Sequence, residues 1–226
     1  NIKRLMLEPL ASADAVLSKL EKEMGVAVVD IGGGTTDVAV FKNEVLQHSA
    51  VIPLGGSSIT SDIKQAFSVL HAQAEELKIQ EGSALHSKTQ KDIFIQVPGL
   101  KGREARSIAL SDLVYVIEER MKEIIFAVKF QIEQSGYYDR LNAGIVLTGG
   151  GSQLKNLPQL VSLIINKDVL TGYPKERITG EMKEDVNNPM YSTAVGLLMK
   201  YDMLLNNDSP EWDDNILERN VEEESD

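Results

Sequence analysis

The stretch Asp30-Ile31-Gly32-Gly33-Gly34-Thr35-Thr36-Asp37 decides the fold of this 226-residue chain. It overlaps the end of Val26–Ile31, a continuous apolar run rich in β-branched residues, which predicts a buried strand. The three glycines predict a turn, because without Cβ atoms their backbone N–H groups can approach an anion closely. Further strands are expected at 37–41 and at Val45–Ile52, joined by a tight turn. The pattern therefore predicts an antiparallel meander, although such a turn alone could also be an ordinary hairpin.

A second glycine-rich turn follows a second predicted core strand, at 144–147. Here Thr148-Gly149-Gly150-Gly151-Ser152 leads into a helix through Leu157–Ile165. A turn of this kind can lie against a purine or present N–H groups to a phosphate. It matches neither the Gly-x-Gly-x-x-Gly dinucleotide fingerprint nor the Walker sequence. Between the two turns, Glu75 and Lys78 share one face of a predicted helix, where they reach a ribose or purine edge or form a plain surface ion pair.

The other segments are mostly helical by their spacing. Helices are expected at 8–23, 57–70, 73–80 and 191–205, and a long one from a Ser111 cap to about Gln134. The stretch 82–106 is polar, with one short strand at 93–97. We predict an α/β fold, an actin- or ribonuclease-H-like lobe with an inserted smaller α+β subdomain. Its predicted parts are a nucleotide-binding subdomain at 1–56 and 138–205, the insertion at 57–137, and a disordered acidic tail at 206–226.

Composition narrows the classes of partner. The formal net charge is −11, and the stretch 208–226 holds nine acidic residues against one arginine. An acidic surface disfavours nucleic acid and anionic lipid as main partners. The absence of cysteine excludes disulfides and thiolate metal sites. No apolar run approaches the roughly 20 residues that a membrane-spanning helix needs.

The order of these motifs resembles the second half of the superfamily of actin, sugar kinases and DnaK-type chaperones. Within it, the sequence is most similar to the family of the bacterial cell-division protein FtsA. The stretches that carry this closer resemblance are Leu7-Glu-Pro-Leu-Ala-Ser-Ala13, 25–37, 51–63, 143–152 and Tyr191-Ser-Thr-Ala-Val-Gly-Leu-Leu198. The resemblance spans about Leu7 to Leu205. The nucleotide motifs are common to the superfamily, whereas the Ile59–Ile63 and 191–198 stretches point to FtsA.

The resemblance implies that ATP and Mg²⁺ are the cofactors. It places Asp30, Gly32, Gly33, Gly34, Thr35 and Thr36 at the phosphates, with Asp30 holding Mg²⁺ through water. It places Glu75 and Lys78 at the ribose and adenine, and Gly149, Gly150, Gly151 and Ser152 at the adenosine. No catalytic residue is assigned, and weak or no hydrolysis is expected rather than metabolic chemistry. The family's first lobe should precede residue 1, so we expect this chain alone to bind ATP weakly.

The resemblance also implies partners. FtsA proteins receive the C-terminal peptide of FtsZ on the inserted subdomain, self-associate into actin-like filaments and recruit other division proteins. The cations expected at the FtsZ site are Arg106 and Arg120, with Lys101 and Arg103 nearby; solvated surface arginines are the alternative. The family acts on the cytoplasmic face of the membrane at the division septum, through a C-terminal helix that we expect to lie outside this chain.

Three other functions stay open at this point. A phosphotransferase such as a sugar kinase would need a substrate-binding aspartate, which cannot be placed here. A chaperone-type ATPase usually has phenylalanine at the position of Thr36 and a substrate domain after the nucleotide lobe. A further actin-like scaffold, related to MreB or to pilus-assembly proteins, is the third alternative.

Overall fold

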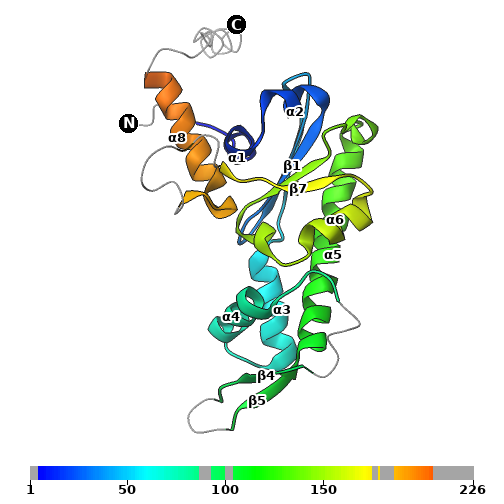
Figure 1. Cartoon of the computed structure of the whole chain (residues 1–226), viewed down its shortest axis with the longest axis vertical. Coiled ribbons are helices and arrows are strands. Elements are labelled where there is room, and N and C mark those ends of the chain that lie inside the picture. The colour runs from blue at the N-terminus through cyan, green and yellow to red at the C-terminus, as the bar shows by residue number, and fades with distance from the viewer. Residues whose placement is uncertain (1–4, 87–92, 100–103, 175–177, 179–185, 206–226) are drawn as a thin grey trace, which may run out of the picture.

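The computed structural model describes residues 5–86, 93–99, 104–174, 178 and 186–205 (Figure 1). The predicted acidic tail at 206–226 lies outside these residues, as do Lys101 and Arg103 of the predicted partner site. Among the helices in the described ranges, none is both long enough and apolar enough to cross a membrane.

Five strands form the main sheet: β1 (Val26–Ile31), β2 (Thr36–Lys42), β3 (Val45–Ile52), β6 (Ile145–Thr148) and β7 (Val169–Thr171). Their spatial order is β3-β2-β1-β6-β7. The pairs β1–β2 and β2–β3 are antiparallel, so the expected meander is confirmed. The pairs β1–β6 and β6–β7 are parallel. Parallel strands need both faces covered, which is why every residue of β1 is buried.

Different helices cover the two faces of the sheet. On one face, α1 (Glu8–Val16) packs against Val26 and Val28, and α2 (Lys19–Met24) lies beside β2. On the other face, Ala27, Val29 and Ile31 meet α5 (Leu110–Gln134) and α6 (Leu157–Ile165). This division follows from β geometry, because successive side chains of a strand point to opposite faces. The last helix, α8 (Ser192–Leu205), packs against α1 (Figure 1).

The segment that follows β3 builds a smaller part below the sheet in Figure 1. It contains α3 (Gly56–Phe67), α4 (His71–Glu81) and the antiparallel hairpin β4 (Phe94–Val97) with β5 (Arg106–Ala109). The long helix α5 runs along both parts. Three short 3-10 turns complete the described elements: η2 (Tyr138–Arg140), η3 (Gly150–Gln153) and η5 (Pro189–Tyr191).

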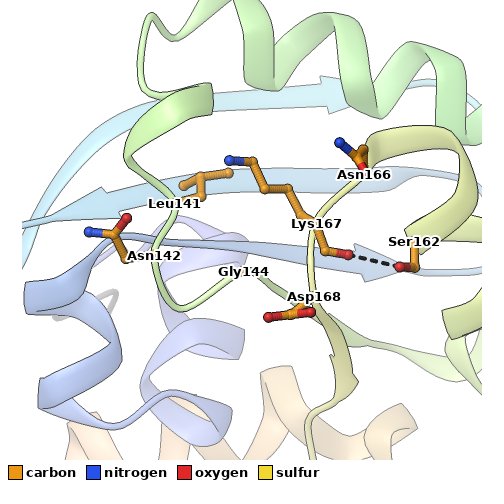
Figure 2. A pocket seen from close by; sticks show the side chains of 7 residues that line it. All are labelled: Leu141, Asn142, Gly144, Ser162, Asn166, Lys167 and Asp168. Atoms are coloured by element: carbon orange, nitrogen blue, oxygen red, sulfur yellow. Dashed lines mark hydrogen bonds between the residues drawn. The ribbon is translucent and has the colours of Figure 1, made fainter.

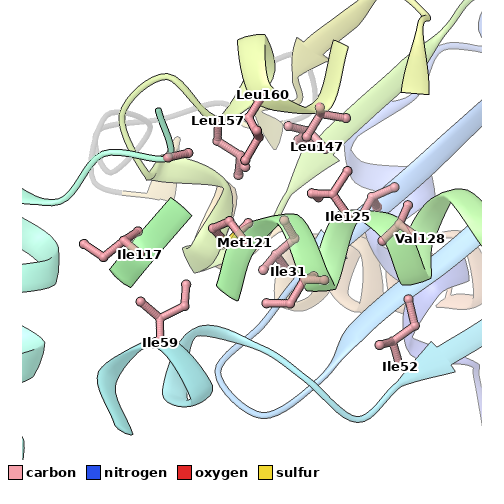
Figure 3. Close-up of a cluster of buried hydrophobic side chains, with 14 of the residues drawn as sticks. Ile31, Ile52, Ile59, Ile117, Met121, Ile125, Val128, Leu147, Leu157 and Leu160 are labelled. Carbon is pink, nitrogen blue, oxygen red and sulfur yellow. The ribbon is translucent and has the colours of Figure 1, made fainter. Parts of the chain in front are cut away.

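One buried cluster joins the two parts (Figure 3). Ile31 and Ile52 of the sheet, Ile59 of α3 and Met121 and Ile125 of α5 belong to it. The apolar side chains spaced along one face of α5 are buried: Leu113, Ile117, Met121, Ile124, Val128 and Ile132. Since α5 contributes to both parts, the sheet and the smaller part are held together by a shared core. The proposed division into subdomains stays a prediction.

The structure differs from the sequence prediction at the first helix. The helix expected at 8–23 is two helices, because Leu17 is extended and Ser18 caps α2. The Ser18 hydroxyl accepts from the N–H of Glu21 at 3.2 Å, and the Glu21 carboxylate accepts from the N–H of Ser18 at 2.7 Å. This reciprocal capping box starts a new helix where the apolar spacing alone indicated continuity.

The predicted start of the long helix is wrong, and one strand was not predicted. Ala109 occupies the cap position of α5 without a side-chain hydrogen bond, so Ser111 lies inside the first turn. The chain enters α5 directly from β5, a strand that sequence reasoning missed. β5 is four residues long and pairs with β4, and a strand this short leaves little periodic signal in the sequence.

Candidate phosphate and nucleotide site

The two glycine-rich turns lie side by side at the carboxyl ends of β1 and β6. Asp30 and Thr148 are register partners on these parallel strands, and each leads into its turn. A Cβ on Gly149 would lie 2.2 Å from Oδ1 of Asp30 and 2.6 Å from the carbonyl oxygen of Ile31. Ligands of open α/β sheets bind outside the carboxyl ends of the strands. The structure therefore brings together the two motifs, 117 residues apart in their first glycines, at the edge where a ligand is expected.

The first turn is supported from behind by α3. The N–H groups of Gly56 and Ser57 donate to the carbonyl oxygens of Gly32 and Gly33 at 2.9 and 2.8 Å. A Cβ on Gly55 would lie 2.7 Å from both carbonyl oxygens, so this close approach requires glycine. These contacts fix the turn to the smaller part of the molecule.

Not every predicted residue of the first turn faces outward. Gly33, Gly34 and Thr35 are exposed and can meet a ligand. Thr36 is fully buried, and its hydroxyl donates to the carbonyl oxygen of Leu54 at 2.8 Å. The one proton of the Thr36 hydroxyl already holds the turn against the following loop, and the contact of Thr36 with a phosphate stays a prediction.

Asp30 is 6% exposed, and the two side-chain hydrogen bonds to its carboxylate group reach the same oxygen. Its Oδ2 accepts from the hydroxyls of Ser12 at 2.5 Å and Thr193 at 3.2 Å. Within the described residues no hydrogen bond reaches Oδ1. Burial raises the pKa of Asp30, and the two hydroxyls counter part of that rise. One carboxylate oxygen is thus fixed and the other is available.

Two further carboxylates share this environment. Asp37, also 6% exposed, pairs with Asp30 across β1 and β2. Burial raises the pKa of Asp37, the hydrogen bond from Thr35 lowers it, and the charge of Asp30 raises it again. Partial burial raises the pKa of Glu8, as do the charges of Asp37 and Asp30. In the described ranges none of the three has a salt bridge, so the site favours a bound cation.

Direct chelation is not the geometry present. In the described part of the chain no three histidine or acidic side chains are close enough to hold a metal ion. A magnesium ion that keeps its waters and is held by one carboxylate through a water would fit this arrangement better.

Glu75 and Lys78 lie directly behind the start of α3. The ammonium of Lys78 donates to Glu75 at 2.8 Å, to the Thr60 hydroxyl at 2.9 Å and to the Gly56 carbonyl at 3.0 Å. Partial burial works to raise the pKa of Glu75, but the hydrogen bonds from Lys78 and Thr60 outweigh it and leave that pKa lowered. The pair thus contacts the residue that backs the first glycine turn.

The second turn is likewise partly internal. The Ser152 hydroxyl is buried and donates to the Gly149 carbonyl at 2.7 Å. The N–H of Gly149 donates to the carbonyl of Pro189 at 3.1 Å, which ties the turn to η5. A Cβ on Gly151 would lie 2.5 Å from a methyl group of Ile31. Of the four residues predicted at the second turn, Gly150 is the exposed one, and Gly149, Gly151 and Ser152 shape the turn.

The predicted partner-binding arginines lie on the smaller part. Arg106, on β5, is exposed and donates to the carbonyl oxygens of Phe67 and Ser68 at the end of α3. Arg120, on α5, binds Asp62 of α3 through two hydrogen bonds and also pairs with Glu123. Hydrogen bonding to Asp62 raises the pKa of Arg120. Arg106 therefore offers a less compensated charge than Arg120.

A polar hollow of about 270 Å³ lies elsewhere (Figure 2). Its lining includes Leu141, Gly144 and Asp168, which precede β6 and β7. It is therefore at the amino ends of these strands, at the opposite edge of the sheet from the glycine turns. Lys167 in its wall lies 4.7 Å from the ring of Tyr138. Because ligands of open α/β sheets bind outside the carboxyl ends of the strands, we do not assign this hollow as the nucleotide site.

Sequence reasoning missed Glu8, Ser12 and Thr193, although it quoted the stretches that contain them. Ser12 stands between Ala11 and Ala13, all three fully buried. A serine on an otherwise apolar helix face was a usable signal, because a buried hydroxyl needs a partner.

Comparisons with known proteins agree with this geometry. The family model "Cell division protein FtsA" matches residues 27–196. Cell division protein FtsA of Pseudomonas aeruginosa is 42% identical over 195 residues, 86% of this chain and 46% of that protein. The Escherichia coli K12 protein is 41% identical over 87% of this chain and 48% of its own length. That of Bacillus subtilis is 34% identical over 86% and 42%. The chain spans about half the length of these relatives.

Solved structures share the fold at low identity. MreB5 of Spiroplasma citri bound to ADP has a TM-score of 0.71 at 18% identity, covering 89% of this chain and 60% of that one. A PilM–PilN type IV pilus biogenesis complex has a TM-score of 0.63 at 18% identity, covering 88% and 52%. A MamK mutant bound to AMPPNP has a TM-score of 0.60 at 16% identity, covering 85% and 57%. The predicted α/β, actin-like fold class is therefore confirmed.

Proposed function

The chain belongs to the family of the cell division protein FtsA, and on that premise we propose that it is the nucleotide- and FtsZ-binding part of a division-site adaptor. The observation that carries the nucleotide half of this proposal is the pair of glycine turns at adjacent strand ends, with Asp30 between them. Self-association into filaments, recruitment of other division proteins and a place on the cytoplasmic face of the membrane at the septum belong to the same proposal.

In this proposal the exposed N–H groups of Gly33, Gly34 and Thr35 meet the phosphates of ATP. A glycine turn presents such groups without Cβ atoms in the way. Gly150 of the second turn and the Lys78–Glu75 pair beside the start of α3 would contact the adenosine. The ADP and AMPPNP in the MreB5 and MamK structures support the choice of ligand by analogy of fold.

Magnesium fits the residues present. Asp30 is buried, one of its oxygens is held by two hydroxyls, and the other is available. When bound, the ion would neutralise phosphate charge. Asp30 would hold one of its waters, and the nearby charges of Asp37 and Glu8 would favour the cation.

Asp30→Asn should separate binding from stability. Burial raises the pKa of Asp30 in the folded chain, so the folded state binds its proton more tightly than the unfolded state. Stability from this group therefore falls as pH rises through that raised pKa. We expect asparagine to stabilise the fold at pH 7 by about 1 kcal/mol, or about 2–4 °C in Tm.

Thermal unfolding of both chains at pH 7 and pH 3 checks this expectation. At pH 3 the aspartate is protonated in both states, so the difference in Tm should vanish. The same variant should lose the Mg²⁺-dependent part of nucleotide binding. A lower Tm for asparagine at pH 7 would contradict the account of Asp30 as a group kept for binding at the expense of stability.

The FtsZ half of the proposal rests on the surface around Arg106. Leu70, on the loop that precedes α4 and two residues after the Ser68 carbonyl that Arg106 binds, is 47% exposed. Gln73 of α4 donates to the carbonyl of Pro98, which holds the hairpin against this helix. An exposed apolar side chain near a cation suits a short peptide that mixes acidic and apolar residues.

Arg106→Glu should weaken binding of a labelled C-terminal FtsZ peptide about tenfold, measured by fluorescence anisotropy. Reversing an exposed charge acts on the peptide without disturbing a core, so the circular dichroism spectrum should not change. Arg140→Glu, an exposed arginine on η2, is the matched control and should leave the affinity unchanged. Equal affinities for all three chains would refute this site. Arg120→Glu is a poorer test, because it would leave Asp62 without its partner.

A further inference from the structure

The first turn of α8 is hydrogen-bonded to the ends of the two central strands, β1 and β6. The Ser192 hydroxyl lies 2.6 Å from the hydroxyl of Thr148, near the end of β6. The next residue, Thr193, donates to Oδ2 of Asp30, near the end of β1. Since Asp30 and Thr148 are register partners, two adjacent residues of one helix reach the points from which both glycine turns begin.

The same carboxylate oxygen is also held from α1. Ser12 is fully buried, and its hydroxyl lies 2.5 Å from Oδ2 of Asp30 and 2.8 Å from the hydroxyl of Thr193. A hydroxyl has one proton to donate. If Ser12 donates to Asp30, Thr193 shares its proton between Ser12 and Asp30. Two helices from opposite ends of the chain therefore converge on one oxygen and leave Oδ1 free of these contacts.

The packing of α1 on α8 fixes where these hydroxyls stand. A Cβ on Gly196 would lie 1.8 Å from the carbonyl oxygen of Ala11, so the two backbones touch at that point. The touching residues are the neighbour of Ser12 and the residue one turn after Thr193. Because the backbones cannot approach further, the two hydroxyls have little freedom to follow a displaced carboxylate.

We propose that Ser12 and Thr193 are positioning residues that hold Oδ2 of Asp30 so that Oδ1 faces the magnesium–nucleotide complex. This role rests on the proposed function, because it belongs to the same site. Neither residue would touch the nucleotide. Without the hydroxyls the carboxylate can rotate away from the metal, whereas contacts of the glycine turns with the nucleotide do not depend on them.

The test separates metal-dependent from metal-independent binding. The isotope-labelled 226-residue chain is titrated with AMPPNP, with and without Mg²⁺, and followed by NMR, which resolves millimolar affinities. In Ser12→Ala and Thr193→Val, the gain in AMPPNP affinity on adding Mg²⁺ should be about tenfold smaller than in the parent. Their affinity without Mg²⁺ should stay within about twofold of the parent's. Thr193→Ser keeps the hydroxyl and should keep the gain. A gain equal to the parent's in both variants, or an equal loss with and without Mg²⁺, overturns the proposal.

A second measurement needs no nucleotide. In a double-mutant cycle, Ser12→Ala should lower Tm by about 4 °C when Asp30 is present and by much less in Asp30→Ala, which leaves no acceptor. Additive shifts would overturn the positioning role alone. A parent chain that binds AMPPNP in neither condition would instead overturn the proposed function, and this role with it.

Discussion

Gly196→Ala should lower the free energy of unfolding by about 3 kcal/mol or more. The added methyl group would lie 1.8 Å from the carbonyl oxygen of Ala11, and backbone cannot move aside as a flexible side chain can. To relieve this overlap, α8 must separate from α1 along their contact. The better helix propensity of alanine, about 1 kcal/mol, offsets only part of the loss.

Thermal unfolding checks this effect, with an expected fall in Tm of about 6–12 °C. Gly136→Ala is the matched control, because Gly136 has a φ of +72° but no atom within 4 Å of an added Cβ. It should cost only the backbone strain, about 1 kcal/mol. A loss in Gly196→Ala no larger than that in Gly136→Ala would contradict the account of a tight backbone contact between α1 and α8.

Gly149→Ala should cost at least about tenfold in nucleotide affinity, or roughly 1.4 kcal/mol. The new Cβ would lie 2.2 Å from Oδ1 of Asp30, the oxygen that the proposed site leaves for a magnesium-bound water. The φ of Gly149 is +82°, which alanine adopts only with strain. Both effects displace the second turn from the first, so phosphate and adenosine contacts would suffer together.

The readout is an AMPPNP titration with Mg²⁺, read beside a Tm measurement. Gly150→Ala serves as the control for folding, since the nearest atom to its added Cβ is 3.9 Å away. It should unfold at nearly the same temperature as the parent, whereas Gly149→Ala should lose a few degrees. Unchanged affinity in Gly149→Ala would contradict the placement of the nucleotide between the two turns.

The strands and turns that carry the site were predictable because their signals are local. Apart from Asp30, Val26–Ile31 is apolar because both faces of the strand are covered, and the glycines after Ile31 break it at once. The failures were local conflicts. A capping box at Ser18 interrupted a helix whose apolar spacing continued, and β5 is too short to leave a period.

The sequence by itself determined the central strands, the two glycine turns and the family, because apolar runs, glycines and motifs act over a few residues. Only the tertiary structure decided which hydroxyls of the turns point inward. Thr36 and Ser152 turned inward, each satisfying a nearby backbone carbonyl. Ser12 reached Asp30 from 18 residues away and Thr193 from 163. Such partners are chosen by how helices pack on a sheet, and no spacing along the chain records that choice.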